Sequence, residues 1–385
     1  MKKLNWGMIG GGEGSQIGPA HRLGAHVDGL FQLAAGALDI DPEKGRDYAM
    51  RLGIAEDRAY GDWREMLAGE RGREDRIDLV TIATPNATHY EISKAFLEAG
   101  FNLLCEKPMT VTVDEGEEIV SLAESSGCVF AVNYGYTGYA LVRHMRVMIE
   151  RGDLGKIRLV KAEFAHGFHA DAGDADNPRV RWRYDPAEAG MSAVLADAGI
   201  HALQMACFVT GQEVEKLSAD FAACVASRTL EDDAMLCFRM SEGAVGRLWT
   251  SAVAVGHMHG LNIEVFGEKG GLHWAQEWPN QLYWTPLNEP TRILERGAPN
   301  LSPDADRASH VAVGHAEGMS LAFANIYKDL AEVIGAARDG REPDPVATHY
   351  PRAIDGLNSM AAVQAAVSSA KNGGRWEDAR PPSRR

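Results

Sequence analysis

The chain has 385 residues, of which 45% are hydrophobic and 24% are charged, and this length predicts two domains rather than one core. Acidic side chains outnumber basic ones by 54 to 39, a net charge of −15, which argues against nucleic acid or an anionic membrane surface as a partner. No signal-peptide pattern opens the chain and no stretch reaches the ~18 apolar residues of a membrane span. The five scattered cysteines suit a reducing compartment, so we expect a cytoplasmic protein.

The first third of the chain alternates short apolar runs with helical patterns. Such alternation predicts an α/β domain whose parallel sheet carries helices on both faces. We place this domain at residues 1–133. The expected strands are Asn5–Ile9, Gln32–Leu38, Leu79–Ala83, Asn102–Cys105 and Val129–Val132, with helices near Pro19–Gly29, Pro42–Leu52, Asp62–Leu67, Ala87–Ala99 and Val113–Ser126.

The pattern changes after about residue 134, where strand-like segments dominate. It predicts an α+β domain at residues 134–345 with a large, mostly antiparallel open sheet covered on one face. Residues 346–378 would form a C-terminal helix that can pack back on the first domain, and residues 379–385 a disordered tail. Residues 286–310 suggest a long surface excursion. The expected strands are Ile157–Ala165, Glu215–Val225, Ala234–Met240, Ala244–Ser251, Leu261–Phe266, Gly271–Trp274 and Gln281–Trp284, and the expected helices are Tyr139–Glu150, Ala193–Thr210, His315–Arg338 and Pro351–Lys371.

A glycine-rich turn, Gly10–Gly18, follows the first expected strand and precedes a helix. Glycine permits a tight turn and the close approach of a pyrophosphate, and the helix N-terminus adds N–H groups and a partial positive charge. The usual spacing would place a third glycine where Ser15 stands. Such a turn can be purely structural, but its context favours a Rossmann dinucleotide site. The residues expected to line it are Gly10, Gly12, Ser15, Gln16 and Ile17.

The matching acid is Asp39, at the end of the second expected strand. A carboxylate there accepts hydrogen bonds from the adenosine ribose and repels a 2′-phosphate, which predicts NAD over NADP. Asp39 or Asp41 could instead cap the helix that starts near Pro42. Asp41, directly before the proline, is the better cap and leaves Asp39 for the ribose. Arg46 works against this preference, because it could meet a phosphate.

Three further polar motifs follow in order along the chain. Thr84-Pro85-Asn86, with His89 one turn later, and Glu106-Lys107-Pro108 each follow an expected strand, and Asp197 precedes His201 by four residues. The carboxyl ends of strands in an open α/β sheet form the ligand crevice. Together with the glycine turn, these motifs resemble the glucose–fructose oxidoreductase/inositol dehydrogenase/rhizopine-catabolism family of nicotinamide-dependent oxidoreductases. The resemblance extends from residue 5 to about residue 330.

The resemblance implies further contacts to the cofactor, with Glu106 at the nicotinamide ribose. Asn86 can also cap the next helix, and His89 can equally be a satisfied structural histidine. Gly18 and His21 look like the family's third glycine and the histidine after it, displaced by a three-residue insertion. The residues implied are Thr84, Pro85, Asn86, His89, Glu106 and Lys107.

The resemblance also implies that Lys107, Asp197 and His201 carry the chemistry. His201 would be the general base that takes the hydroxyl proton as hydride leaves the carbon, since an imidazole titrates near the working pH. Lys107 would polarise the substrate hydroxyl, and Asp197 would orient or assist. Four-residue spacing on a helix places Asp197 and His201 on one face; a helix cap and a buried histidine are the structural alternatives. Gly190-Met191-Ser192-Ala193 replaces the family's glycine-rich stretch, so the pocket wall is expected to differ.

Substrate contacts are expected mainly from the second domain. Tyrosine and tryptophan offer a sugar ring an apolar face and a hydrogen-bonding edge, and Arg183 could pair with a hydroxyl or a carboxylate. Tyr134 and Tyr139 belong to the same aromatic cluster as Tyr136, and many of these rings could simply be core. The expected set is Lys107, Tyr136, Trp182, Arg183, Asp197 and His201. The pairs His166/His169 and His257/His259 offer too few ligands, so no metal is expected.

The leading interpretation is an NAD-dependent dehydrogenase that passes hydride from a ring CH–OH of a cyclic polyol (an inositol, sugar, anhydrosugar or glycoside) to the nicotinamide. One alternative is an enzyme of the same family that cleaves glycosides or eliminates with recycled NAD. Another is a non-catalytic nucleotide-binding sensor, against which the intact set of Lys107, Asp197 and His201 argues. The free face of the open sheet predicts a homodimer or homotetramer, as is common in the family.

Overall fold

The computed structural model describes residues 3–385 and divides the chain into two compact units. The first unit comprises the residues up to Gly138, except residues 111–113, together with Gly318–Gly356. The second unit comprises Tyr139–Glu317, Leu357–Arg385 and residues 111–113. The boundary expected at residue 345 therefore differs from the observed division, because residues 318–356 group with the first unit. No helix among the described residues combines the length and the apolar character needed to cross a membrane.

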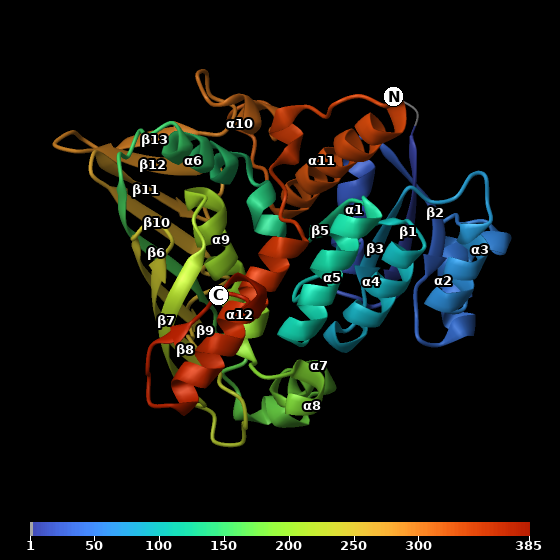
Figure 1. Cartoon of the computed structure of the whole chain (residues 1–385), viewed down its shortest axis with the longest axis horizontal. Coiled ribbons are helices and arrows are strands. Elements are labelled where there is room, and N and C mark those ends of the chain that lie inside the picture. Colours follow the sequence, from blue (N-terminus) through green and yellow to red (C-terminus); the bar gives the residue numbers. More distant parts are fainter. Residues whose placement is uncertain (1–2) are drawn as a thin grey trace. The chain divides into compact units, whose positions relative to one another are not determined.

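Within the described residues, the first unit is built on a five-stranded sheet in the order β2-β1-β3-β4-β5, with every neighbouring pair parallel (Figure 1). Parallel strands need crossover connections, which helices provide. The α/β architecture expected from the alternating pattern is confirmed. The strands are β1 (Leu4–Gly10), β2 (Phe31–Ala37), β3 (Leu79–Ala83), β4 (Asn102–Cys105) and β5 (Phe130–Val132), and the helices are α1 (Gly18–Val27), α2 (Pro42–Arg51), α3 (Trp63–Arg71), α4 (His89–Glu98), α5 (Val113–Ser126) and α11 (Met319–Asp339).

Helix α11 lies late in the sequence but belongs to the first unit, where it packs against α1. Gly24 allows the two helices to approach, because a Cβ there would lie 3.0 Å from the Cβ of Phe323. Tyr327 of α11 enters the core of the unit, with its ring centroid 5.6 Å from those of Trp6 and Phe31. The sequence predicted that the last helix could pack on the first domain. In the structure α11 takes that place, and most of the final helix, α12 (Ala353–Lys371), belongs to the second unit.

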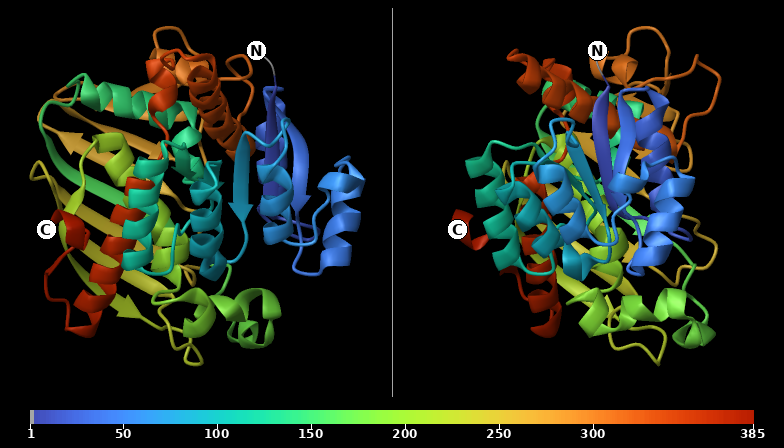
Figure 2. Two further views of the ribbon diagram at one scale, coloured as in Figure 1. Left: turned by 45° about the vertical axis from the view of Figure 1, so that its right-hand side comes forward. Right: turned by 90° about the vertical axis from the view of Figure 1, so that its right-hand side faces the viewer.

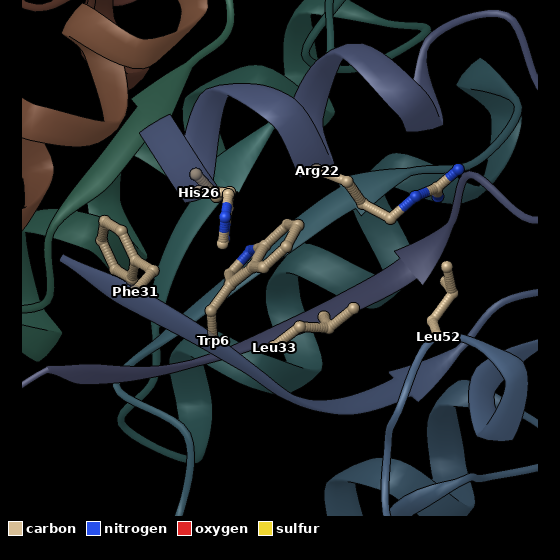
Figure 3. A pocket seen from close by; sticks show the side chains of 7 residues that line it. Trp6, Arg22, His26, Phe31, Leu33 and Leu52 are labelled. Carbon is tan, nitrogen blue, oxygen red and sulfur yellow. The ribbon is translucent and has the colours of Figure 1, made fainter. Parts of the chain in front are cut away.

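A small cavity of about 240 Å³ lies between α1 and the strands β1 and β2 (Figure 3). Apolar side chains line most of it, including Trp6 and Phe31, and Arg22 stands at one end. The Arg22 guanidinium donates to the carbonyl oxygen of Gly11 at 2.6 Å and to the Tyr48 hydroxyl at 3.0 Å. Helix α1 is thereby tied to the glycine turn that precedes it.

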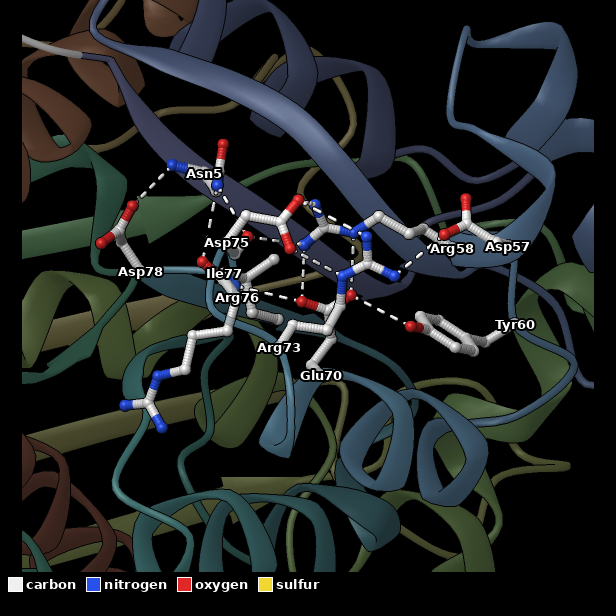
Figure 4. Close-up of polar contacts among 10 residues, drawn as sticks. All are labelled: Asn5, Asp57, Arg58, Tyr60, Glu70, Arg73, Asp75, Arg76, Ile77 and Asp78. Carbon is white, nitrogen blue, oxygen red and sulfur yellow. Dashed lines mark hydrogen bonds and ion pairs between the residues drawn. The ribbon is translucent and has the colours of Figure 1, made fainter.

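A buried ion pair joins α3 to the segment before it (Figure 4). Arg58 donates to the two carboxylate oxygens of Glu70 at 2.6 and 2.9 Å. Glu70 also accepts hydrogen bonds from the Tyr60 hydroxyl at 3.0 Å and from the backbone N–H of Ile77 at 3.1 Å. Arg58 also lies 3.4 Å from the exposed carboxylate of Asp75. Since both members of the Arg58–Glu70 pair are buried, removing one would leave the other poorly compensated.

Within the described residues, the second unit is built on a nine-stranded sheet in the order β13-β12-β11-β10-β6-β9-β8-β7-β14. Neighbouring strands are antiparallel except for β6 and β9. Helices α6 (Ala140–Glu150) and α9 (Ile200–Thr210) lie against one face of the sheet (Figures 1 and 2), which confirms the expected covered open sheet. The strands are β6 (Ile157–Ala165), β7 (Val214–Ala222), β8 (Asp233–Met240), β9 (Val245–Ser251), β10 (Asn262–Gly267), β11 (Gly270–Ala275), β12 (Gln281–Pro286), β13 (Arg292–Glu295) and β14 (Glu377–Asp378); short helices are α7 (Pro178–Arg181), α8 (Pro186–Ala189) and α10 (Pro303–Arg307).

Two segments differ from the sequence-based expectation. The excursion expected at residues 286–310 contains β13, which pairs with β12, and α10. Strand β13 is a mostly exposed edge strand of four residues, so it lacks the apolar alternation that marks a half-buried strand. The tail, expected to be disordered, lies against β7: the N–H of Ala379 donates to the carbonyl oxygen of Glu215 at 2.8 Å, and Arg384 pairs with Glu213 at 2.7 Å.

Candidate functional site

The glycine turn takes the path that a dinucleotide site needs. Gly10 and Gly11 have φ angles of +74° and +67°, which side chains with a Cβ rarely adopt. A Cβ on Gly18 would lie 2.1 Å from the carbonyl oxygen of Gly11, so the start of α1 packs directly on the turn. Gly18 thus does the packing expected of a third glycine. Ser15 closes the inserted residues, since its hydroxyl accepts a hydrogen bond from the Gly18 N–H at 3.1 Å.

The two acids after β2 take different places. Asp41 caps α2, where its Oδ1 accepts from the N–H groups of Glu43 at 3.1 Å and Lys44 at 3.3 Å. Asp39 is not the cap, and its Oδ1 accepts from the N–H of Asp41 at 2.9 Å. The other Asp39 oxygen lies 3.7 Å from where a Gly12 Cβ would stand. Asp39 is therefore beside the turn, where the adenosine ribose of a dinucleotide would bind.

Arg46, which could have met a phosphate, is engaged elsewhere. Its guanidinium pairs with Glu65 at 2.6 Å. The positive group that argued for NADP in the sequence is thus neutralised by a neighbour on α3.

The motif after β3 is more structural than the sequence suggested. Asn86 lies in the 3-10 turn Asn86–Thr88, while the N-cap position of α4 is held by Thr88 with no side-chain cap bond, so the expected Asn86 cap is wrong. His89 is fully buried, with its ring nitrogens 2.8 Å from the carbonyl oxygen of Pro108 and 2.9 Å from that of Thr84. Burial lowers the pKa of His89. These contacts favour the structural alternative for His89, a brace between the strand ends of β3 and β4.

Glu106, at the end of β4, is buried among polar groups of the first unit. Its carboxylate accepts hydrogen bonds from Nε2 of His21 at 2.9 Å and Nδ2 of Asn133 at 2.5 Å, and from the backbone N–H of Lys107 at 3.2 Å. Burial by itself favours the neutral acid, but the hydrogen bond and attraction of His21, with help from Asn133 and Lys107, outweigh it and lower the pKa of Glu106. An anion therefore stands beside the half-buried Lys107. The Lys107–Pro108 peptide is cis.

In the second unit, Asp197 and His201 lie on a helical segment that changes its winding between them. Leu195–Gly199 forms a π-helical turn and α9 begins at Ile200, whereas an ordinary helix was expected over both residues. The start of this turn is fixed by the buried Glu231, whose Oε1 accepts from the Ser192 hydroxyl at 2.5 Å and the Leu195 N–H at 3.2 Å. π-helical turns are rare in proteins, and those that occur are often found at functional sites.

Arg183 is paired with Asp197 within this unit. Its Nε donates to Oδ2 of Asp197 at 3.2 Å, and its guanidinium lies over the Trp182 ring at 4.5 Å. Asp197 keeps 42% of its side chain exposed. Arg183, which was expected to contact the substrate, therefore holds the carboxylate of Asp197, which was expected to orient His201 or the substrate.

The three tyrosines of the expected cluster differ in burial and in the unit to which they belong. Tyr139 is buried against Trp274, with ring centroids 5.1 Å apart, and belongs to the core of the second unit. Tyr136 is half-buried in the 3-10 turn Gly135–Gly138 of the first unit, and Tyr134 is buried in that unit. Of the three, Tyr136 alone keeps the exposure that a substrate contact needs.

Histidines at the end of β6 lie near Asp197, although their spacing in the sequence pointed only to a possible metal site. The Nδ1 atom of His166 accepts from the N–H of Phe168 at 3.3 Å, and Nδ1 of His169 lies 3.1 Å from the Tyr184 hydroxyl. Burial, then the neighbouring His169, lowers the pKa of His166 to about 4, while Asp197 opposes the shift. His166 is thus neutral near pH 7, with its proton on Nε2, which suits it to an uncharged hydroxyl. The signal in the sequence was His-Gly-Phe-His.

A parallel dinucleotide-binding sheet in one unit, and an acid–histidine pair on an open-sheet unit, define a nicotinamide-dependent oxidoreductase of two domains. Residues 4–134 match the model described as an oxidoreductase family with an NAD-binding Rossmann fold, and residues 142–273 match the GFO/IDH/MocA C-terminal domain. The chain belongs to the GFO/IDH/MocA family. The match confirms the family and the NAD-binding Rossmann domain expected from the motifs.

Known relatives match this chain over 73% to 98% of its length. The uncharacterized oxidoreductase YfiI of Bacillus subtilis is 41% identical over 97% of this chain and 96% of its own. An inositol dehydrogenase homolog from Azotobacter vinelandii, complexed with NAD+, has a TM-score of 0.92 at 40% identity, and its complex with NADH and myo-inositol has 0.89 at 39%; both cover 98% of this chain and 97% of theirs. Levoglucosan dehydrogenase of Pseudarthrobacter phenanthrenivorans is 27% identical over 73% of this chain and 76% of its own.

Proposed function

We propose that this protein is an NAD-dependent dehydrogenase of cyclic polyols, with inositols and pyranose-like sugars as its substrate class. The observation that carries the proposal is the likeness over 98% of the chain to a homolog complexed with NADH and myo-inositol. The chemistry of the second unit agrees with it. Asp197, His201 and the neutral His166 offer acceptors and donors suited to hydroxyl groups rather than to a charged substrate.

The roles follow from what each side chain can do. His201 takes the proton of the substrate hydroxyl as general base. Lys107, beside the Glu106 anion, donates to the same oxygen and stabilises its developing charge. Asp197, fixed by Arg183, orients the imidazole or the substrate. NAD, when bound, supplies the hydride acceptor at C4 of the nicotinamide, so the ring CH–OH becomes a ketone and the proton leaves from His201.

The residues of the first unit fit NAD better than NADP. A Cβ at Gly12 would meet the backbone of Leu38, and a Cβ at Gly18 that of Gly11, so both glycines allow the close packing of the tight turn that a pyrophosphate site uses. Asp39 presents a carboxylate beside this turn, which pairs with ribose hydroxyls and repels a 2′-phosphate. Arg46 is paired with Glu65 in the structure and not directed to a phosphate by any contact of its own.

We further propose that the protein is a homodimer or homotetramer formed through the outer face of the nine-stranded sheet. Leu159, Phe266 and Ile293 are exposed on β6, β10 and β13, and the register puts them on the face opposite the buried Val160 and Val265. A hollow of about 540 Å³ lies across β10, β11 and β12. Exposed apolar groups spread over one sheet face favour association with a second copy.

Two substitutions test the assigned roles. Lys107→Ala and His201→Ala are each expected to lower kcat by about 10²- to 10⁴-fold, because each removes a proton-handling or charge-stabilising group from the transition state. NAD affinity, measured by fluorescence titration, should change little. Lys94→Ala and His315→Ala replace the same residue types away from both motifs and serve as controls; Lys94 is half-buried and paired with Glu118, and His315 is exposed. Loss of NAD binding in both test variants, with activity per bound NAD unchanged, would contradict the roles.

A further inference from the structure

A row of buried polar side chains leads from Glu106 into the core of the first unit. Nε2 of His21 lies 2.9 Å from Oε1 of Glu106, and Nδ1 of His21 lies 2.9 Å from the Tyr327 hydroxyl. That hydroxyl lies 2.8 Å from Oγ1 of Thr81, which accepts from the indole N–H of Trp6 at 2.9 Å. His21, Thr81 and Tyr327 are buried and come from α1, β3 and α11. We call these five side chains the Glu106 relay.

The two ends of the relay fix the direction of its hydrogen bonds. An indole N–H can only donate, and an ionised carboxylate can only accept. With a neutral His21, each bond has a donor only if Thr81 donates to Tyr327 and Tyr327 donates to Nδ1 of His21. His21 then carries its proton on Nε2 and donates it to Glu106. Every donor in the row thus points toward one carboxylate.

The surroundings of Glu106 show which groups keep it ionised. A buried carboxylate without donors is costly. His89 of α4 directs its two ring nitrogens to the carbonyl oxygens of Pro108 and Thr84. Burial lowers the pKa of that histidine and raises the pKa of the adjacent Cys105 thiol. Besides Lys107, the stabilising partners are His21 and the neutral amide of Asn133. His21 is itself held in place by a second buried side chain, Tyr327.

We propose that His21 and Tyr327 are positioning residues of the dehydrogenase: the Glu106 relay that they complete fixes the Glu106 carboxylate as an anion beside Lys107, and so sets where the reacting lysine stands. The step through Lys107 rests on the proposed function. The hydrogen-bond pattern of the relay does not. Helix α11 then contributes to the site from the far end of the sequence, because Tyr327 lies 306 residues after His21.

Kinetics of three variants test the positioning role. His21→Leu removes the donor and is expected to lower kcat by about 10- to 100-fold, the effect of a misplaced reacting group, while His21→Gln, which keeps an N–H, restores much of it. Tyr327→Phe keeps the ring packing and should lower kcat less. His26→Leu, on the same helix, and Tyr90→Phe, on α4, are the matched controls.

The pH profile separates positioning from a general loss of packing. In the wild type the lowered pKa of Glu106 keeps the carboxylate ionised through the neutral range. Without His21, burial raises that pKa, so the acid limb of kcat/KM should move to higher pH in His21→Leu and stay in place in His26→Leu. The proposal would be overturned if His21→Leu and Tyr327→Phe both matched the controls in kcat and in the acid limb of kcat/KM. Should His21→Leu fail to fold, Tyr327→Phe decides alone.

Nitrogen-15 NMR of the full-length protein tests the relay without any turnover. The signals of His21, assigned by their loss in His21→Gln, should show a proton on Nε2. In Tyr327→Phe the Nδ1 signal should shift, because its hydroxyl partner is lost. A ring without a proton on Nε2, or an Nδ1 signal that Tyr327→Phe leaves unchanged, would overturn the relay. If no polyol is oxidised, the proposed function fails while these spectra still decide the relay.

Discussion

At the residue scale, Asp39 carries the choice of cofactor. Asp39→Ser removes an ionic acceptor for the ribose and the charge that repels a 2′-phosphate, so kcat/KM for NAD should fall about tenfold or more and the ratio of NAD to NADP use should drop. Steady-state kinetics with both cofactors measure this ratio. Asp41→Ser keeps a capping side chain on α2 and should leave it unchanged. An unaltered ratio in Asp39→Ser would place the ribose contact elsewhere.

His166 makes a pH-dependent contribution at the same scale. Its pKa is lowered from 6.5 to about 4 in the folded chain, so between these values the unfolded chain takes up a proton that the folded chain refuses. The free energy of unfolding therefore falls as the pH decreases from 6.5 toward 4. Between pH 7 and pH 5, the free energy of unfolding of the wild type should fall by about 2 kcal/mol more than that of His166→Gln, as measured by urea unfolding. The exposed control His315→Gln should behave as wild type, and equal losses in wild type and His166→Gln would refute the burial of a neutral His166.

The site residues that the sequence could predict are those whose role is local. The Asp41 cap and the glycine turn follow from their immediate neighbours, and both are where the pattern placed them. The partners Arg183 and Asp197 are 14 residues apart in the sequence, and Tyr327 and His21 are 306 residues apart. No local pattern encodes such partners, because they meet only after α11 and the sheet have packed.

At the scale of elements, alternation of apolar runs and helical periods was enough to predict the parallel sheet and most strands of the second sheet. The pattern did not show the π-helical turn Leu195–Gly199, whose first N–H donates to the buried Glu231, a residue from a later segment. Nor did it show that α11 joins the first unit. An amphipathic helix reveals that it has a partner but not which one.

The Arg58–Glu70 pair gives a stability prediction at this scale. Glu70→Ala leaves a buried guanidinium with only the more exposed Asp75, 3.4 Å away, as an anion, and should lower the free energy of unfolding by about 3–5 kcal/mol. The double change Arg58→Met with Glu70→Leu should recover part of that loss, the remainder reflecting the unpaired Ile77 N–H and Tyr60 hydroxyl. Chemical denaturation measures both. Asp57→Ala, at the exposed rim of the network, should cost at most about 1 kcal/mol. A small cost for Glu70→Ala would mean that water reaches the pair.

At the scale of the whole molecule, the outer face of the nine-stranded sheet predicts self-association. Light scattering of the purified protein should give a mass two or four times that of one chain. Phe266→Glu with Ile293→Glu places charges on that face and should shift the mass toward the monomer, whereas Ile40→Glu, at a fully exposed position of the first unit, should not. A monomeric wild type would contradict self-association through this face, which would then be available to another partner.

NADH absorbance on mixing the purified protein with NAD and a panel of inositols, pyranoses, anhydrosugars and glycosides tests the central claim most directly. We expect a steady rise with at least one cyclic polyol, and none for the Lys107→Ala variant at the same concentration. A flat trace with a consumed glycoside would instead indicate a cofactor that is recycled within each turnover. Flat traces with nothing consumed, from protein that binds NAD, would contradict a cyclic polyol dehydrogenase.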